Sequence, residues 1–294
     1  MKNVLSFALA TAFLAQGTFA KAAEPVELDP SSQWNLDYAD EACRLGRSFG
    51  EGDQKVVLVF AKYAPGPDME IIARGKPLSS KGASGFSYRW GSRDKVDVER
   101  PLFGNADDGS TIWQFSGTLL TPDTAEKFEK GGIPIDQIKA AEDAASADIE
   151  SFTMQVGRRA PVTLETGSLG KGFEAMDQCL DSLVESWGFD PARQSMIVTA
   201  PQPVGKITNW FNSRDYPSTP LRNDVAGAVR FRLAIDEGGA ITDCTIQSAY
   251  SDPAFAEKVC SEFRRNGKFK PAVDAAGNGI ATFWAATVVF VPSA

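Results

Sequence analysis

The stretch "AGAVRFRLAIDEGGAITDCTIQSA", residues 226–249, decides the fold expected for the C-terminal part of the chain. In its first half, apolar residues take every second position, with arginine or alanine between them: Val229, Phe231, Leu233 and Ile235 alternate with Arg230, Arg232 and Ala234. This alternation is typical of a β-strand with one buried face, because successive side chains point to opposite sides of a sheet. Residues 236–239 supply an Asp-Glu-Gly-Gly turn, and residues 241–248 return as the second strand of a β-hairpin.

A helix and a final strand are expected after the hairpin. Asp252 is a suitable capping residue, and Pro253 suits the first helical turn. The apolar side of this helix is formed by Phe255, Val259 and Phe263. After a connector over residues 268–279, the run "IATFWAATVVFV" (280–291) predicts the last strand. The order β–β–α–β predicts a small two-layer α+β unit.

The first residues of the chain have the order of a secretory signal peptide. Lys2 is followed by an uncharged run over residues 3–20, and small residues at Ala20 and Ala22 suit cleavage. The apolar part of this run is shorter than the ~20 residues that span a bilayer. We therefore expect residues 1–22 to be removed on export, with no stable membrane insertion afterwards.

The four cysteines are expected to form two disulfides, because an exported chain folds in an oxidising compartment. The sequence contains no histidine, and its cysteines lack the short spacing of a zinc site, so no metal is expected. Cys244 lies on the returning strand and Cys260 on the helix that packs over it, so a bond would join the two layers. Such a loop is valued at about 3 kcal/mol in the chain-entropy model.

The remaining pair is Cys43 and Cys179. Cys179 lies beside the apolar stripe of a strongly predicted helix between Ser168, a suitable N-cap, and Gly188. That stripe consists of Leu169, Phe173, Met176, Leu180, Leu183 and Trp187. A disulfide between Cys43 and Cys179 would close a very long loop, which the entropy model values at about 4–5 kcal/mol.

The chain divides into a β-rich N-terminal domain, a linker and the small C-terminal unit. Short apolar runs bounded by turn residues predict strands over residues 55–63, 69–75, 85–90, 96–103, 111–120, 151–158 and 160–166, with helical spacing over 123–150. The expected boundaries are 23–190 for the first domain, with residues 24–33 as a short polar leader, 191–214 for a Pro-containing linker, and 215–294 for the second domain. Tyr88, Trp90 and Trp113 are expected in a sandwich core rather than on a binding face.

The C-terminal unit resembles the C-terminal domain of the TonB family. The resemblance rests on Tyr216-Pro217, Gly227, Val229, Phe231, Ile235-Asp236, Gly239, Ile246 and "KFKPAVDAAGNG" (268–279). The most specific of these is the Phe269-Lys-Pro271-Ala272 element followed by Gly277. It implies a periplasmic β-β-α-β fold whose last strand offers its edge to an extended peptide, such as a segment of an outer-membrane receptor. Carried over to this chain, the candidate partner-binding residues are Thr282, Trp284, Ala286, Val288 and Phe290. The alternative is a core strand with no exposed edge.

Departures from the family shape the functional prediction. The resemblance to energy transducers implies an uncleaved anchor with a histidine and a long Pro-rich spacer. This chain has no histidine, a leader expected to be cleaved and a globular domain in place of the spacer. We therefore expect an exported, non-enzymatic periplasmic protein with a protein-interaction module, and the alternative is a membrane-anchored transducer.

The other functional classes have weaker sequence support. Nucleic-acid binding is disfavoured by the net charge of −8, because phosphate contacts need clustered lysine and arginine. Ser168 and Lys171 spell the S-x-x-K of serine acyl-transfer enzymes, but the downstream S-D-N and K-T-G elements are missing. The start of a helix accounts for the same two residues equally well. An envelope acyl-transfer enzyme is therefore the second alternative and not the main prediction. No cofactor is expected.

Overall fold

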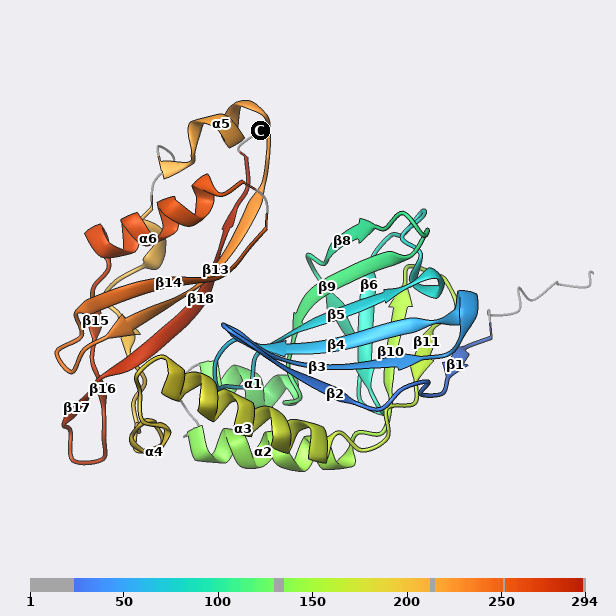
Figure 1. The fold of residues 1–294 in the computed structure, drawn as a ribbon, viewed down its shortest axis with the longest axis horizontal. Helices are drawn as coiled ribbons and strands as arrows, with labels where there is room; N and C mark the ends of the chain where they lie inside the picture. The colour runs from blue at the N-terminus through green and yellow to red at the C-terminus, as the bar shows by residue number, and fades with distance from the viewer. Residues whose placement is uncertain (1–23, 130–134, 212–214, 251, 293–294) are drawn as a thin grey trace, which may run out of the picture.

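The structure is a computed structural model that describes residues 24–129, 135–211, 215–250 and 252–292. The expected signal peptide, residues 1–22, lies outside the described residues. The chain folds into a β-rich N-terminal part and a C-terminal region (Figure 1). Each of these parts has its own main hydrophobic core. Both strands and helices are present in each, which confirms the α+β class.

The N-terminal part contains two β-sheets. The larger has the order β2-β3-β4-β5-β9-β8 and consists of β2 (Asn35–Ala39), β3 (Ala42–Phe49), β4 (Val56–Lys62), β5 (Met69–Gly75), β8 (Leu102–Asn105) and β9 (Thr111–Gly117). The smaller has the order β1-β11-β10-β6-β7 and consists of β1 (Val26–Leu28), β6 (Phe86–Trp90), β7 (Val96–Val98), β10 (Phe152–Val156) and β11 (Val162–Leu164). Neighbouring strands are antiparallel except β1 and β11, which are parallel.

Aromatic side chains from both sheets fill the first core. Phe60 of β4 lies 5.6 Å from Trp90 of β6, and Phe86 of β6 lies 4.5 Å from Trp113 of β9, between ring centroids. Tyr88, Trp90 and Trp113 are all buried, as the sandwich-core prediction required. Large aromatic side chains that meet across two sheets supply much of the apolar area that stabilises such a core.

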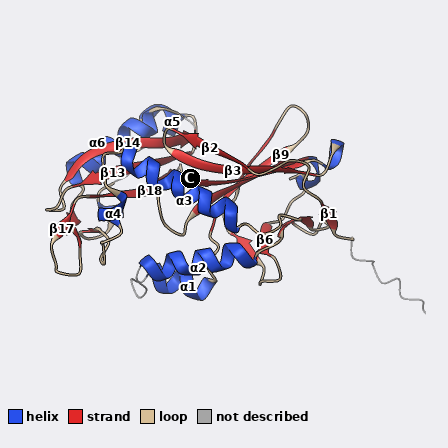
Figure 2. Ribbon diagram, turned by 60° about the horizontal axis from the view of Figure 1, so that its bottom comes forward, coloured by secondary structure: helices blue, strands red, loops and turns tan. Residues whose placement is uncertain are grey.

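Three helices lie together beside the larger sheet: α1 (Pro122–Glu129), α2 (Ile135–Asp148) and α3 (Gly170–Ser186) (Figures 1 and 2). Helix α3 packs against β3, and α2 packs against α3. The predicted apolar stripe of α3 faces the core through Phe173, Met176 and Leu180. The Cys43–Cys179 disulfide joins the start of β3 to α3, with an S–S distance of 2.05 Å, so this predicted pairing is confirmed.

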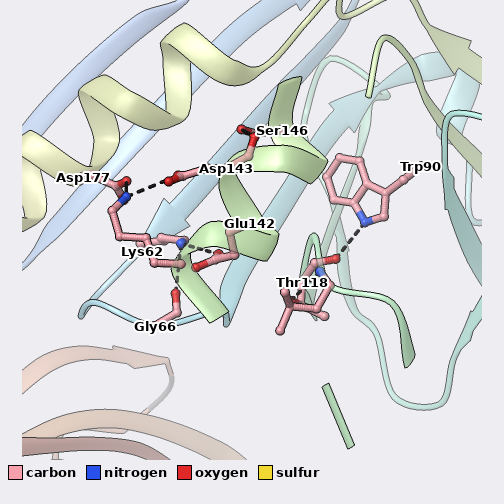
Figure 3. A network of polar contacts seen from close by, with 10 residues as sticks. Lys62, Gly66, Trp90, Thr118, Glu142, Asp143, Ser146 and Asp177 are labelled. Carbon is pink, nitrogen blue, oxygen red and sulfur yellow. Dashed lines mark hydrogen bonds and ion pairs between the residues drawn. The ribbon is translucent and has the colours of Figure 1, made fainter. Parts of the chain in front are cut away.

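A polar network fixes α2 against both β4 and α3 (Figure 3). The ammonium of Lys62, almost fully buried, lies 2.8 Å from the carboxylate of Glu142 and donates to the carbonyl of Gly66 at 2.9 Å. Burial raises the pKa of Glu142, against the opposing attraction of Lys62. Beside this pair, Lys139 of α2 forms ion pairs with Asp143 and with Asp177 of α3.

The C-terminal region contains a three-stranded antiparallel sheet of order β14-β13-β18. Its strands are β13 (Gly227–Ile235), β14 (Ile241–Tyr250) and β18 (Thr282–Phe290), and its helices are α5 (Ser218–Arg222) and α6 (Ala254–Asn266). Helix α6 packs against β13 and β14 and buries Phe255, Val259 and Phe263 between them. The Cys244–Cys260 disulfide joins β14 to α6, as predicted.

The residues expected to form a linker pack against the C-terminal region. They contain α4 (Pro191–Gln194), β12 (Gln202–Pro203) and a short helix η3 (Ile207–Asn209), and they lie beside β15 (Phe269–Lys270), β16 (Ala272–Val273) and β17 (Gly279–Ile280). Strand β12 pairs with β15, and the amide of Val198 donates to the carbonyl of Val273 at 3.0 Å. Trp210 is buried in the second core, 5.6 Å from both Phe263 and Phe269.

Three local predictions differ from the structure. The segment expected to be a polar leader includes β1, which pairs with β11. Because the two strands are far apart in the sequence, no local pattern could predict that they pair. The single strand expected over residues 96–103 is divided into β7 and β8, which lie in different sheets on either side of Pro101. The N-cap of α3 is Leu169, and the hydroxyl of Ser168 accepts only from the amide of Gly170, at 3.3 Å. The remaining short helices are η1 (Gly52–Gln54) and η2 (Lys76–Leu78).

Candidate functional site

Strand β18 lies at one edge of the C-terminal sheet. It pairs with β13 along its whole length, from Phe290 opposite Gly227 to Thr282 opposite Ile235. In the part of the chain that the structure describes, its other side pairs with no strand. An edge of this kind presents main-chain N–H and C=O groups that can accept another strand.

The composition of β18 leaves this edge without the usual protection. Proteins shield exposed edges with charged residues, proline or bulges. The run from Thr282 to Val291 contains no charged residue, no proline and no glycine. The opposite edge strand, β14, differs because it carries Asp243 and two breaks in its register with β13, where Thr242 and Gln247 are the additional residues. Such bulges disrupt regular pairing, so the two edges of the sheet are not equivalent.

The candidate residues of β18 point their side chains toward the second core. Thr282 and Phe290 are buried, and Trp284 lies 5.2 Å from Phe269 between ring centroids. Ala286 and Val288 are half-buried against the same core. These five residues therefore offer a partner their main chain more than their side chains.

The opposite face of β18 carries exposed side chains that the sequence prediction did not include. Thr287 is exposed, and Val289 and Val291 have exposed fractions of 62% and 65%. The beginning of this face is covered: the ring of Phe283 lies 5.1 Å from Trp187 and 5.8 Å from Phe189. The period of two identifies Val289 and Val291 as neighbours on one face, but it does not say which face is covered.

The N-terminal part covers the middle of the same sheet face. The guanidinium of Arg232 lies over the ring of Trp187 at 4.2 Å and forms an ion pair with Glu41 at 3.6 Å. Arg230 lies over the ring of Tyr63 at 4.6 Å. Arg232 is only 6% exposed, and its burial lowers its pKa from the ordinary value.

We call this set of residues the inter-core contact. It is formed by Glu41, Tyr63, Trp187 and Phe189 on one side and by Arg230, Arg232, Gln247 and Phe283 on the other. The side-chain amide of Gln247 completes it by donating to the main-chain carbonyl of Tyr63 at 2.7 Å. Two β13 arginines that alternation places on the outer face of the sheet are thereby stacked on aromatic rings.

The first residues of β18 are also contacted by α4. The side-chain amide of Gln194 donates to the carbonyl of Ala281 at 2.9 Å, and its oxygen accepts from the hydroxyl of Thr282 at 2.6 Å. Arg193, the preceding residue, pairs with Glu237 in the β13–β14 turn at 2.8 Å. Helix α4 is therefore fixed beside the beginning of β18.

The residues considered for acyl transfer form no comparable arrangement. Ser168 and Lys171 are both exposed, and no hydrogen bond joins their side chains in the structure. All four cysteines are in disulfides. Among the described residues, no three His, Cys, Asp or Glu side chains come together as a metal site would require.

The described helices are all too short or too polar to cross a bilayer.

No curated protein matches the chain in a sequence comparison. A comparison with protein families matches the region of the chain that contains α5, α6 and the β14-β13-β18 sheet. Residues 212–292 match the family of the Gram-negative bacterial TonB protein C-terminal.

Proposed function

We propose that this chain is a non-enzymatic, exported periplasmic protein that binds other envelope proteins through its C-terminal region. An extended segment of the partner pairs with the edge of β18, and the partner class includes outer-membrane receptors. The observation that carries the proposal is the unprotected edge of β18 in a region that matches the TonB C-terminal family.

The chemistry of strand addition fits this edge. The main chain of an added strand supplies hydrogen bonds for affinity, and its alternate side chains supply selectivity. The core-facing side chains of β18 hold its main chain in place, since Trp284 and Phe290 pack among the aromatic rings of the second core. A rigid edge is favourable because little conformational entropy is lost when a strand is added.

A charged residue on the edge tests the proposal. Val289→Lys introduces the kind of residue that protects natural edge strands, and because Val289 is exposed the change leaves the packed core unaltered. Val198→Lys is the matched control, since Val198 is a valine of similar exposure (59%) that lies outside β18.

The measurement is quantitative mass spectrometry of solubilised envelope proteins retained by the immobilised mature chain. The proposal predicts that proteins retained by the wild type are also retained by Val198→Lys. It predicts that Val289→Lys retains about tenfold less of these proteins, or less still, where a tenfold loss of affinity is a change of about 1.4 kcal/mol in binding free energy. Equal retention by all three proteins, or retention by none, would contradict it.

The membrane-anchored alternative is separated by a different experiment. A transducer that transmits force needs its N-terminal segment to remain in the inner membrane. Sequencing the N-terminus of the protein purified from cells distinguishes the two: the proposal predicts a chain that begins after Ala20 or Ala22, whereas an intact Met1 in the membrane fraction favours the transducer.

A further inference from the structure

The edge of β18 is not equally available along its length, because the N-terminal end of the strand is already occupied. An incoming strand would need the main-chain carbonyls and amides that face away from β13. At the beginning of β18, the carbonyl of Ala281 already accepts a hydrogen bond from Gln194 at 2.9 Å. The same side chain accepts from the hydroxyl of Thr282, so Gln194 is held by two bonds and not by one.

The side chains at this end are covered as well. Phe283 is the first residue of β18 on the outer face, and the rings of Trp187 and Phe189 pack against it at 5.1 and 5.8 Å. An added strand that ran past Phe283 would find the outer face of Phe283 already covered by these rings, so its own side chains could not pack over that residue. Both the main chain and the outer face are therefore engaged at the same end of the strand.

The other end is open. Thr287, Val289 and Val291 are exposed on the outer face, and Ala228 is the β13 neighbour of Val289. Pro292 follows directly and has no amide hydrogen to donate, which ends the pairing capacity of the strand. The available edge thus extends over residues 286–291, bounded by α4 contacts at one end and by a proline at the other.

We propose that the partner strand pairs only with residues 286–291, and that Gln194, bound to Ala281 and Thr282, sets this register by blocking the N-terminal end of the edge together with the rings over Phe283. The inference rests on the proposed function and adds that the N-terminal part and α4 select which partner segments fit. The family match covers β18 but not the residues that contact its N-terminal end, because Trp187, Phe189 and Gln194 lie outside residues 212–292.

The exposed side chains define the chemistry of the occupant. The segment must be extended and short, and its side chains on the outer face must pack on Val289 and Val291. β-Branched and aromatic side chains suit such cross-strand positions. A charged side chain placed there would lose water against valine and alanine without gaining a partner, which disfavours it. We therefore expect an uncharged segment of another envelope protein.

Site-specific photo-crosslinking in cells tests this register. Benzoylphenylalanine is placed singly at Phe283, Val289 or Val291 of the full-length chain, and crosslinked peptides are identified by mass spectrometry. The inference predicts crosslinks to another envelope protein from positions 289 and 291. At position 283 it predicts an intramolecular crosslink to the segment that contains Trp187 and Phe189.

Each outcome has a separate meaning. Intermolecular crosslinks from position 283 as abundant as those from 289 would overturn the restricted register and leave strand addition intact. An absence of intermolecular crosslinks at all three positions would overturn the proposed function itself. Crosslinks from 289 to a second copy of this chain would contradict the assignment of the occupant to another protein.

The role of Gln194 is tested by the position of the crosslink. In a Gln194→Ala background, the photoreactive group at position 289 is expected to react with a partner residue displaced by two positions, because a strand keeps its faces only when it slips by an even number of residues. Gln202→Ala, which truncates an exposed glutamine of β12, is the control and should leave the crosslinked residue unchanged. An unchanged site in Gln194→Ala would contradict the positioning role.

Discussion

The guanidinium of Arg232 on β13 lies 4.2 Å from the centre of the Trp187 ring at the end of α3. This contact joins the two cores of the protein, and it is the reason that an arginine on the outer face of a sheet is 6% exposed. The Cys43–Cys179 disulfide lies in the same two elements that support Trp187 and Glu41, namely α3 and the β2–β3 hairpin. The N-terminal part therefore presents a covalently braced surface to the C-terminal sheet.

The energetic coupling between Arg232 and Trp187 can be measured directly. A double-mutant cycle with Arg232→Met and Trp187→Leu should give a coupling free energy of about 1–2 kcal/mol, because a cation–π pair is stronger when water is excluded from it. The free energies of unfolding would come from urea denaturation. Arg230 and Trp187 serve as the control pair, because each stacks on a different residue and not on the other. The effects of substituting these two residues on the free energy of unfolding should add within about 0.5 kcal/mol. Additivity of the first pair would contradict the contact.

The two disulfides should differ in their contribution to stability. The chain-entropy model expects the loss of Cys43–Cys179, which spans 136 residues, to lower the free energy of unfolding by about 4–5 kcal/mol. The loss of Cys244–Cys260, which spans 16 residues, should lower it by about 3 kcal/mol. Paired Cys→Ala variants compared by denaturant unfolding test the order. Mass spectrometry of the wild type must find no free thiol, and four free thiols would contradict the account.

The buried Lys62–Glu142 pair should be sensitive to the loss of one partner and tolerant of the loss of both. Glu142→Gln leaves the ammonium of Lys62, which is 2% exposed, without its counter-ion and should destabilise the protein by about 3–5 kcal/mol. The double variant Lys62→Met with Glu142→Leu removes both charges and should recover most of that loss. Denaturant unfolding of the three proteins decides the matter: a double variant less stable than Glu142→Gln would show that the pair itself is strongly stabilising.

The acid dependence of stability should reveal Asp108. Its carboxylate accepts hydrogen bonds from the hydroxyl and amide of Ser110 and pairs with Arg74, and these contacts lower its pKa from 3.8 to about 2. A lowered pKa means that the unfolded chain takes up the proton first as pH falls. The stability from Asp108 is therefore complete above about pH 4 and lost between pH 4 and 2.

This loss is measured by comparing the wild type with Asp108→Asn. The difference in free energy of unfolding between them should be constant from pH 7 to about pH 5 and should shrink as the pH approaches 2. Asp107→Asn, at the neighbouring exposed acid, is the control for the loss of one negative charge. A difference for Asp108→Asn that does not change with pH would argue against the lowered pKa.

The sequence predicted the C-terminal sheet well because its signals are local. Alternation in residues 229–235 predicts a strand, and the observed β13 and β14 follow the expected hairpin. The same alternation could not predict that Arg230 and Arg232 lie on aromatic rings, because Tyr63 and Trp187 are distant in sequence and carry no signal that they meet this face. Polar residues at alternate positions of a strand can face solvent, or they can face another part of the protein that covers them.

The candidate site was predicted in part. The last strand is correctly located, and its position at the edge of the sheet agrees with what the family resemblance implies. The exposed residues Val289 and Val291 were not distinguished from core residues, because hydrophobic periodicity does not say which face of an edge strand is covered. The contacts of Gln194 with Ala281 and Thr282 were missed because residues 191–214 were interpreted as a linker from their prolines.

Hydrogen exchange across β18 tests the central claim most directly. The full-length protein is compared alone and with the envelope protein that it retains. If that protein adds a strand to the edge, amides within residues 286–291 should exchange at least about tenfold more slowly in the complex, while exchange in β14 should not change. Unchanged exchange in β18 when the partner is bound, or protection of β14 instead, would contradict the account.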